Sequence, residues 1–527
     1  MTNIDQHQMR ETTMYPGTYA SSAPDRPAVI GSGSGDVVTY RELEDRSNQL
    51  AQLWWSLGIR PGDHVAILAE NHTRYFEVYW AAMRSGLYLT CVNRHSTPEE
   101  IAYVVNDCAA RCLVTTHLLA ECVSDAVTRL VGTPLRFMMD GVVDGFESYE
   151  TVVENLPITP LEHQPRGDVM LYSSGTTGTP KGIRRALTGL EIDDPRGMGT
   201  GYFASELLGI DESSVYLVPA PMYHSAALQW SAGAQALGAT VVLMDRFDAR
   251  EFLRSIERHS VTHTQVVPTM FVRLLQLPES ERAEYYLSSL RSVLHAAAPC
   301  PPSVKNDVIE WFGPIVSELY SGTEGLGITF ITTPEWLERP GSVGRAVLGI
   351  PHICDDHGEP VAAGEIGTVY FERDTMPFEY HNDAEKTTDS QHPQRPGWST
   401  IGDVGYLDTD GYLYLTDRKA FTIISGGVNI YPAEIEACLM SHLQVADVAV
   451  FGLPDPEMGE CVHAVVEPYS FPTGDDDLVI ELRTYVRERL AGYKVPRSIE
   501  FARELPRLES GKVKKNDLRR ACLAARR

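Results

Sequence analysis

The sequence has no apolar run of the roughly 20 residues that a membrane-spanning helix needs. Its first residues, MTNIDQHQMRETTMYPG, are polar and lack the apolar core of a secretory signal, so we expect a cytoplasmic protein. Basic charge is also scarce: 45 Lys and Arg stand against 71 Asp and Glu, a net charge of −26. This balance argues against broad nucleic-acid binding and means that local donors must hold any anionic ligand.

The nine cysteines are scattered and lack the spacing of a zinc site. Cys108 and Cys112 form the only close pair, and their C-x-x-x-C spacing has no second half elsewhere in the sequence. We therefore expect these cysteines to be buried free thiols.

Apolar and amphipathic segments alternate along much of the first 300 residues. The apolar runs at 64–68 (HVAIL) and 111–116 (RCLVTT) predict strands, and the amphipathic run at 39–58 predicts a helix. Strands that alternate with helices indicate a layered α/β domain with largely parallel sheets. Three further predicted strands continue the pattern, at 215–221, 239–245 and 262–268.

The pattern changes within residues 364–418, where short apolar runs are joined by Gly and Asp turns. The sequence DTDG at 408–411 is a hairpin signal. After Arg418, a helix predicted to begin at Pro432 is followed by two apolar strands and an amphipathic helix, which indicates a small α+β domain. A chain of 527 residues allows two to four domains. We predict an N-terminal domain at 1–416, a hinge at 417–420 and a C-terminal domain at 421–527.

The segment from Tyr172 to Gly182, YSSGTTGTPKG, predicts a polyphosphate-binding loop. Its three glycines allow close backbone approach, successive N–H groups can form an anion-binding nest, and Lys181 adds a positive charge. The other donor and glycine positions are Ser173, Ser174, Gly175, Thr176, Thr177, Gly178 and Thr179. A flexible linker is the alternative; a Walker A loop is excluded because the lysine follows proline and precedes glycine.

Two later segments place carboxylates beside glycine turns. In Glu318–Gly325 (ELYSGTEG), a hydroxyl beside a carboxylate is suited to a phosphate oxygen and its Mg²⁺, with a surface turn as an equal alternative. In Gly402–Tyr406 (GDVGY), the carboxylate is suited to a ribose diol, because it accepts two hydroxyl donors. Arg418 suits the same region or a phosphate, and the alternative is a structural hairpin with a surface ion pair.

A third segment, Glu509–Lys515 (ESGKVKK), places one lysine on a glycine turn near the C-terminus. Such a lysine can reach into a neighbouring site. The alternative is a basic, solvated tail, and that alternative describes Lys514 and Lys515 well.

In this order, and with GGVNIYPAEIE at 426–436, the segments resemble the adenylate-forming superfamily of acyl-CoA synthetases, luciferases and peptide-synthetase adenylation domains. The resemblance covers about residues 20–520. It implies a multi-layer α/β N-terminal adenylation domain with a distorted barrel subdomain, followed by a mobile α+β C-terminal domain. It also implies ATP, Mg²⁺, CoA and a carboxylic acid as ligands, and it allows a homodimer.

The family's nucleotide-binding roles carry over to matching residues. The loop 173–181 would hold the β- and γ-phosphates, Thr323 the α-phosphate and Glu324 the Mg²⁺, with Ser321 and Gly322 beside them. Tyr320 would stack on adenine, and the other face of the base would meet Ala297, Ala298 and Pro299. Asp403 would hold the ribose hydroxyls with support from Arg418.

The roles in the two chemical steps carry over in the same way. Lys512 would reach the carboxylate and the α-phosphate during adenylation. His224 would lie where the acyl pocket and the thiol channel meet, and Gly322 would also border that pocket. The pantetheine path would be lined by Ser425, Gly426 and Gly427.

Two positions depart from the family pattern. Ala420 stands where the family often has Asp or Lys after the hinge arginine, and this change bears on the balance between the two half-reactions. Tyr223-His224 stands where amino-acid-activating domains have Phe-Asp, which favours a substrate without an α-amino group. No carrier-protein motif follows in the sequence, so we expect CoA as the acceptor.

We therefore expect an AMP-forming acyl-CoA ligase. The small residues at 224–238 predict either a wide apolar cavity or tight helix packing, with equal weight. The cavity would take a bulky hydrophobic acid of secondary metabolism: terpenoid or steroid-like, aryl or long-chain. The alternatives are a freestanding enzyme that performs mainly one half-reaction and a non-catalytic nucleotide-binding or acyl-binding homologue.

Overall fold

The computed structural model describes most of the chain. For four residues it describes the backbone alone: Asp417, Arg418, Asn429 and Asp476. The described residues are 15–132, 134–172, 180–197, 199–418, 421–425, 428–456, 458–470, 476–507 and 513–525. Two compact units divide the chain. The first comprises residues 1–266, 277–294 and 377–387, and the second comprises residues 267–276, 295–376 and 388–527.

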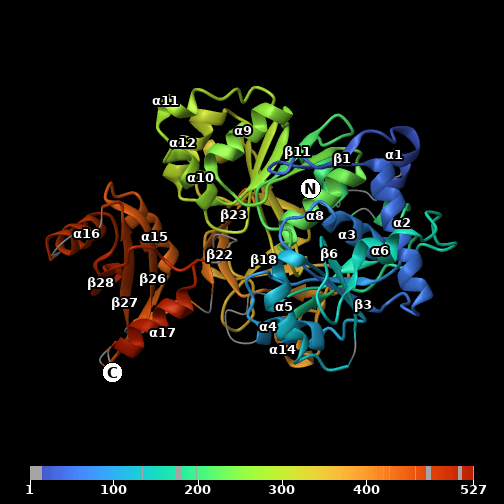
Figure 1. Ribbon diagram of the computed structural model, residues 1–527. Helices are drawn as coiled ribbons and strands as arrows, with labels where there is room; N and C mark the ends of the chain where they lie inside the picture. The colour runs from blue at the N-terminus through green and yellow to red at the C-terminus, as the bar shows by residue number, and fades with distance from the viewer. Residues whose placement is uncertain are drawn as a thin grey trace. The chain divides into compact units, whose positions relative to one another are not determined.

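A parallel sheet in the first unit has the strand order β7-β6-β5-β3-β4-β8 (Figure 1). Its strands are β3 (His64–Leu68), β4 (Tyr88–Cys91), β5 (Cys112–Thr116), β6 (Leu135–Met139), β7 (Glu147–Ser148) and β8 (Asp168–Val169). Helices between them are α3 (Tyr75–Arg84), α4 (Pro98–Asp107), α5 (Ala120–Val127) and α6 (Tyr149–Glu154). Every residue of β3 is buried, as expected for a strand covered on both faces.

The first unit also contains the strands β14-β13-β11-β12-β1-β2, in that order. They are β1 (Pro27–Gly31), β2 (Val37–Thr39), β11 (Val215–Val218), β12 (Thr240–Leu243), β13 (His263–Val266) and β14 (Ser292–His295). The helices of this part are α1 (Pro16–Ser22), α2 (Tyr40–Ser56), α7 (Thr200–Leu208), α8 (Ser225–Ala236), α9 (Ala249–His259) and α11 (Glu279–Arg282). A short antiparallel sheet joins β9 (Leu171–Tyr172), β10 (Gly182–Arg184) and β20 (Glu379–Tyr380), and α14 (Ala384–Asp389) follows β20.

Helix α2 shows how local sequence chemistry determines an element boundary. The Thr39 hydroxyl accepts a hydrogen bond from the Glu42 backbone N–H, and the Glu42 carboxylate accepts one from the Thr39 backbone N–H. This capping box satisfies two donors that the first turn would leave unpaired, and such a cap stabilises a helix by about 1 kcal/mol. The predicted helix at 39–58 is confirmed with the bounds 40–56.

The second unit is largely antiparallel. Strands β15 (Val316–Ser321), β16 (Ile328–Ile331) and β17 (Arg345–Leu348) pair in sequence. A second sheet contains β18 (Ile350–Cys354), β19 (Gly367–Glu372), β21 (Trp398–Ser399), β22 (Asp403–Leu407) and β23 (Leu413–Arg418). The helices are α10 (Pro268–Leu275), α12 (Pro302–Phe312) and α13 (Thr333–Glu338).

The hairpin predicted at DTDG is confirmed between β22 and β23. The Asp408 carboxylate accepts hydrogen bonds from the backbone N–H groups of Asp410 and Tyr412. Gly411 has φ +82°, a backbone conformation that glycine adopts without steric cost.

The C-terminal residues form the predicted α+β pattern, shown orange to red in Figure 1. Their sheet has the order β25-β24-β27-β26, with β28 beside β27. The strands are β24 (Ile423–Ser425), β25 (Val428–Ile430), β26 (Val445–Asp455), β27 (Gly459–Pro468) and β28 (Ser498–Phe501), and the helices are α15 (Pro432–Met440), α16 (Asp476–Arg489) and α17 (Lys515–Ala525). The mixed α/β architecture with a small α+β C-terminal part confirms the predicted fold class.

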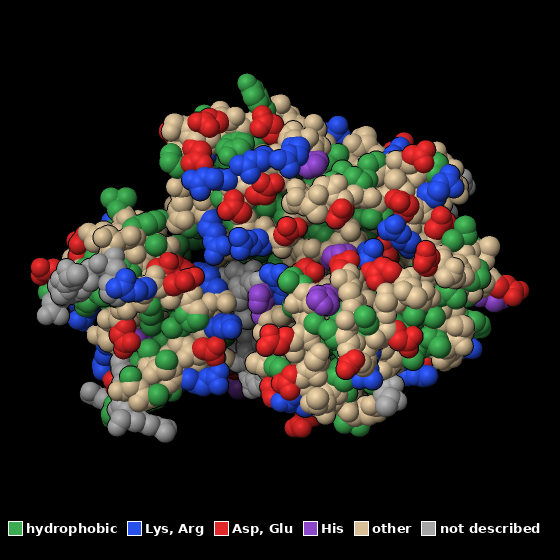
Figure 2. All heavy atoms as spheres, in the orientation of Figure 1, with side chains coloured by type: hydrophobic (Ala, Val, Ile, Leu, Met, Phe, Trp, Pro, Cys, Tyr) green, Lys and Arg blue, Asp and Glu red, His purple; other side chains and the backbone are tan. Residues whose placement is uncertain are grey.

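The described cysteines are free thiols, and both Cys108 and Cys112 are fully buried. Burial raises the pKa of each of these two thiols to about 12. None of the described helices is both long and apolar enough to cross a bilayer. On the face shown in Figure 2, acidic and basic side chains are interspersed, so the negative net charge is not gathered there into one patch.

His64 gives the first unit a specific acid sensitivity. Its ring stacks on Tyr88 with 4.8 Å between centroids, and burial, with help from His381 and Arg184, lowers its pKa from 6.5 to about 4. Between these pH values the unfolded chain binds a proton that the folded chain does not. Stability is therefore lost as the pH falls from 6.5 towards 4, by at most about 3 kcal/mol.

The variant His64→Phe keeps the ring and removes the titration. We expect its urea midpoint to fall less than that of the wild type between pH 7 and pH 4.5. If the urea midpoints of the two proteins fall equally between pH 7 and pH 4.5, His64 is not the group that causes the loss of stability.

Candidate active site

Tyr320 and Asp403 meet at the ends of two strands of the second unit. The Tyr320 hydroxyl donates a hydrogen bond of 2.6 Å to Asp403 Oδ2. Asp403 begins β22 directly after Gly402, whose φ of +80° turns the chain into the strand. Asp403 is 6% exposed, so its carboxylate is held in a defined direction beside an aromatic ring. This arrangement provides a flat ring for a base and an acceptor for hydroxyl groups.

The strand register places the backbone of Arg418 opposite that of Asp403. Asp403 on β22 lies directly opposite Arg418 on β23 in the antiparallel ladder. The two positions therefore meet at the backbone, and the support that Arg418 would give to Asp403 stays a prediction.

The turn after β15 carries Gly322, Thr323 and Glu324, all of them half-exposed. A Cβ atom at Gly322 would lie 2.9 Å from Glu324 Oε2 and 2.9 Å from Ile401 Cδ1, so only glycine fits there without displacing the carboxylate. Ser321 ties the turn together by donating a 2.9 Å hydrogen bond to the Gly327 carbonyl. A half-exposed carboxylate on a defined turn is the hard oxygen ligand that Mg²⁺ requires, so the residues present fit this ion.

The Ala297–Pro299 stretch follows β14 and begins with a strained residue. Ala297 has φ +75°, which is unusual for a residue with a Cβ atom. Strain of this kind costs of order 1–3 kcal/mol and is characteristic of functional sites. That the stretch faces adenine remains a prediction.

A buried ion pair anchors β15 from within. Lys305 Nζ on α12 lies 2.6 Å from Glu318 Oε2, Lys305 is fully buried, and Glu318 is 7% exposed. Lys305 Nζ also lies 4.7 Å from the centroid of the Trp336 ring, and His295 Nε2 lies 3.5 Å from Glu318 Oε2. Burial raises the pKa of Glu318 and lowers that of His295, while Lys305 opposes the shift at Glu318. Glu318 and Tyr320 are two residues apart on β15, so their side chains point to the same face of the strand. The buried Lys305–Glu318 ion pair therefore supports the position of Tyr320.

In the first unit, Lys181 forms an ion pair with Asp383. Lys181 Nζ lies 2.9 Å from Asp383 Oδ2, and the pairing of β10 with β20 brings the two segments together. The hydrogen bond to Asp383 raises the pKa of Lys181. The pKa of Asp383 is lowered by the Lys386 backbone N–H and by Lys181. Residues 173–179 of the predicted phosphate loop lie outside the described residues.

His224 occupies the N-cap position of α8 and is half-buried. Its ring lies 4.3 Å from that of Tyr223. The loop before it is fixed by Asn71, which accepts a hydrogen bond from the Met222 N–H and donates to the carbonyls of Ala220 and Met244. His224 is therefore presented from a well-supported turn.

Several predicted site residues are not tested by the structure. Ser425 lies at the end of β24. The predicted residues Gly426, Gly427, Lys512 and the hinge residue Ala420 lie outside the described residues.

Three supporting residues escape prediction from sequence: Asn71, Lys305 and Asp383. Asn71 lies three residues after the end of the buried strand β3, and a polar residue so soon after such a strand is a usable signal. Lys305 and Asp383 have no such signal, because each pairs with a residue on another element.

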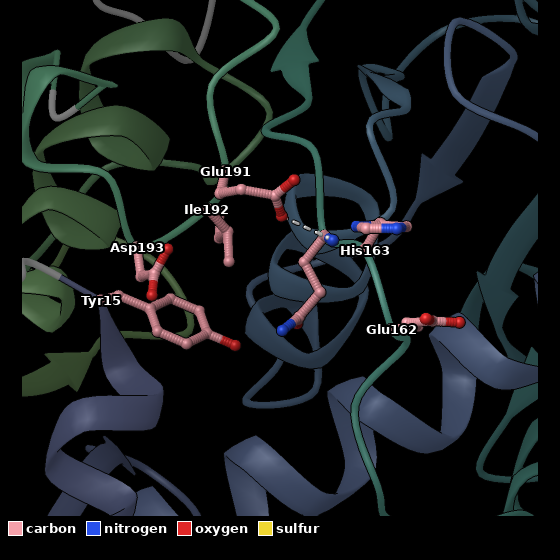
Figure 3. Close-up of a pocket in the computed structure, with 7 residues that line it drawn as sticks. Tyr15, Glu162, His163, Glu191, Ile192 and Asp193 are labelled. Carbon is pink, nitrogen blue, oxygen red and sulfur yellow. Dashed lines mark hydrogen bonds between the residues drawn. The ribbon is translucent and has the colours of Figure 1, made fainter.

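A cavity of about 400 Å³ in the first unit is lined by acidic side chains rather than by the predicted site residues (Figure 3). Its lining residues are Tyr15, Glu162, His163, Gln164, Glu191, Ile192 and Asp193. The Gln164 backbone N–H donates a 2.8 Å hydrogen bond to Glu191, drawn as a dashed line. Three acidic side chains repel a triphosphate or a carboxylate, so this cavity does not suit the predicted substrates.

The whole chain is similar to enzymes that act on nucleotides and acids. The AMP-binding enzyme family matches residues 18–381, and the AMP-binding enzyme C-terminal domain matches residues 434–512. A feruloyl-CoA synthase from Amycolatopsis sp is 34% identical over 96% of this chain and 98% of its own length. A 2-succinylbenzoate–CoA ligase from Bacillus licheniformis is 31% identical over 95% of this chain and 98% of its own.

A solved structure gives the same similarity over the whole length of the chain. The anthranilate CoA ligase AuaEII in complex with anthranoyl-AMP has a TM-score of 0.85 at 25% identity, covering 99% of this chain and 100% of that one. The chain therefore belongs to the AMP-binding enzyme family, in the acyl-CoA ligase branch of the adenylate-forming superfamily, and is an AMP-forming acid–thiol ligase.

Proposed function

We propose that the enzyme activates a bulky hydrophobic carboxylic acid through an acyl-adenylate to its CoA thioester. A carboxylate oxygen attacks the α-phosphorus of ATP and pyrophosphate leaves. The CoA thiol then gives up its proton, its sulfur attacks the acyl carbonyl, and AMP leaves. The observation that carries the first step is the pairing of Tyr320 with Asp403, which provides a base platform and a ribose acceptor in one place.

We assign the triphosphate to Lys181, the adjacent loop and Thr323, with Mg²⁺ held by Glu324. Mg²⁺ would neutralise phosphate charge that otherwise repels the incoming carboxylate. Lys181 is already paired with Asp383 in the structure, so a phosphate would compete with or share that partner. Preorganised donors of this kind are each worth about 10²–10³ in rate.

We propose the binding place of the acid from the surface of helix α8, whose N-cap residue is His224. Part of the small-residue character of α8 reflects packing: a Cβ atom at Gly233 would lie 3.1 Å from the Gly201 backbone nitrogen on α7. A second face, with Ser225, Ala226 and Gln229, is only half-buried. We assign the acyl group to that second face, next to His224.

Among the bulky acids considered, aryl acids have the strongest support. The feruloyl-, 2-succinylbenzoate- and anthranilate-activating relatives are named for aromatic acids. Terpenoid or steroid-like and long-chain acids form the rest of the proposed class.

A panel of acids scored in two assays tests the proposal. ATP–pyrophosphate exchange reports adenylation, and thioester formation from a synthetic acyl-AMP and CoA reports the second step. Exchange and thioester formation with an aryl or other bulky acid support the proposal. Transfer to a carrier protein but not to CoA would replace it with a freestanding adenylating enzyme, and nucleotide binding without exchange on any acid would overturn it.

The ribose assignment gives a separate prediction. Asp403→Asn keeps the side-chain volume but removes the charge, so its hydrogen bonds to hydroxyl groups weaken by about 1–2 kcal/mol. We expect the KM for ATP to rise roughly tenfold, measured by pyrophosphate exchange.

A substrate without the ribose hydroxyls is the control for this variant. With 2′,3′-dideoxy-ATP, the wild type and Asp403→Asn should have similar KM values. A tenfold difference that persists with the dideoxy substrate would show that Asp403 acts elsewhere.

A further inference from the structure

Three side chains that can bind a metal converge in the C-terminal part of the chain, at a place the proposed reaction does not use. They are His463 on β27, Glu500 on β28 and Cys522 on α17. One ligand atom from each lies within 4.8 Å of the other two. His463 and Cys522 are buried, whereas the Glu500 side chain is 53% exposed.

The separations approach the edges of a tetrahedral metal site once the Glu500 carboxylate turns one oxygen toward both other ligands. His463 Nε2 lies 3.6 Å from Cys522 Sγ and 3.6 Å from Glu500 Oε1, whereas Sγ lies 3.6 Å from the other carboxylate oxygen, Glu500 Oε2. Zinc bonds of ~2.3 Å to sulfur and ~2.0–2.2 Å to nitrogen and oxygen, at tetrahedral angles, place the ligand atoms ~3.3–3.6 Å apart. A central ion therefore needs little movement beyond a rotation of the exposed carboxylate.

The orientation of the imidazole also suits a metal ligand. His463 Nδ1 lies 2.7 Å from Ser498 Oγ. If Nδ1 carries the proton and donates it to that hydroxyl, the lone pair of Nε2 is directed to Cys522 and Glu500. A ligand histidine commonly has its second nitrogen fixed in this way.

We propose that His463, Glu500 and Cys522 bind one divalent ion of the zinc class. A thiolate, an imidazole and a carboxylate together favour zinc over Mg²⁺, which prefers oxygen ligands alone. Binding displaces the thiol proton of Cys522 to solvent. The exposure of Glu500 leaves a fourth position for water.

The ion would join three elements that are far apart in the sequence. Helix α17 packs on the sheet through a buried cluster that includes Phe451, Leu505 and Cys522. A bond from Cys522 to an ion shared with β27 and β28 would fasten the last helix of the chain to the sheet. The alternative is a hydrogen-bonded set with no ion, in which the Cys522 thiol donates to Glu500 and its sulfur lies beside His463 Nε2.

Cobalt(II) titration of the full-length, chelator-treated protein separates the two cases. We expect one equivalent to bind with a thiolate-to-cobalt charge-transfer band, which Zn²⁺ then abolishes by displacement. The nucleotide site cannot produce this band, because the residues assigned to it include no thiol. Absence of the band in the wild type would overturn the proposal and leave the hydrogen-bonded set.

Variants identify the ligands. Cys522→Ser should lose the band. The control variant Cys461→Ser removes a buried thiol on β27 that is not among the three ligands, and it should retain the band. Ser498→Ala should weaken the affinity for cobalt by about 10–100-fold, as loss of such a supporting hydrogen bond does elsewhere. Glu500→Gln, at an exposed position that does not threaten folding, should weaken it by at least tenfold. A band that survives in Cys522→Ser, or an unchanged affinity in Glu500→Gln, would also overturn the assignment.

Discussion

Replacing Lys512 with alanine is expected to lower carboxylate-dependent ATP–pyrophosphate exchange by at least about 10²-fold. The reason is electrostatic: the first step brings a carboxylate against a triphosphate, and one well-placed cation is worth about 10²–10³ in rate. Thioester formation from a supplied acyl-AMP has no such encounter and should be largely spared. The two half-reactions are measured separately, as pyrophosphate exchange and as CoA thioester formation.

Lys514 provides the matched control for this experiment. It lies two residues further along, is exposed, and belongs to the basic segment that the alternative interpretation treats as solvated. Lys514→Ala should change neither half-reaction. If Lys512→Ala leaves both half-reactions intact, or lowers both equally, the assignment of Lys512 to adenylation is wrong.

Replacing Lys305 with methionine is expected to lower the free energy of unfolding by about 3–5 kcal/mol. The change leaves Glu318 buried without its cation, and an uncompensated buried charge costs about this much. A urea titration followed by tryptophan fluorescence measures the loss, and Trp336, which contacts Lys305 Nζ, is one of the seven tryptophans that contribute to the signal. Because Glu318 anchors the strand that carries Tyr320, we also expect a higher KM for ATP.

The pH dependence of this variant has a definite sign. Burial raises the pKa of Glu318, and without Lys305 its remaining ion-pair partner among the described residues is His295. The folded variant then holds a proton that the unfolded chain releases above its ordinary pKa of 4.5. Stability of the variant is lost as the pH rises, so its deficit is larger at pH 8 than at pH 5.

The double variant Lys305→Met, Glu318→Gln removes both charges together. It should recover most of the lost stability, because the remaining amide carries no charge to desolvate. A single variant as stable as the wild type, or a double variant no more stable than the single, would contradict the role given to this pair.

Elements with strong local patterns are predictable from the sequence. The run HVAIL becomes β3 with the predicted bounds 64–68, and Pro432 begins α15 as its fixed φ favours. The order of motifs identifies the family, and the register of β22 and β23 places Asp403 and Arg418 opposite each other at the backbone, while their joint role at the ribose stays a prediction.

Contacts between distant elements are not predictable in the same way. Lys181 meets Asp383 only because β10 pairs with β20, and no local pattern links these two segments. The hydrogen bond from Tyr320 to Asp403 likewise depends on how the last residues of β15 lie beside the first residue of β22. The sequence predicts both residues as ligand contacts but does not predict that they bind each other.

The close approach of α7 and α8 also limits how the specificity of this enzyme could be redesigned. A Cβ atom at Gly233 would lie 3.1 Å from the Gly201 backbone nitrogen and 3.2 Å from its Cα, so a larger side chain at Gly233 would press α8 against α7. Mutant libraries intended to admit new acids should therefore leave Gly233 unchanged. Diversity belongs instead at Ser225, Ala226 and Gln229, where a change of volume alters the half-buried face without separating the helices.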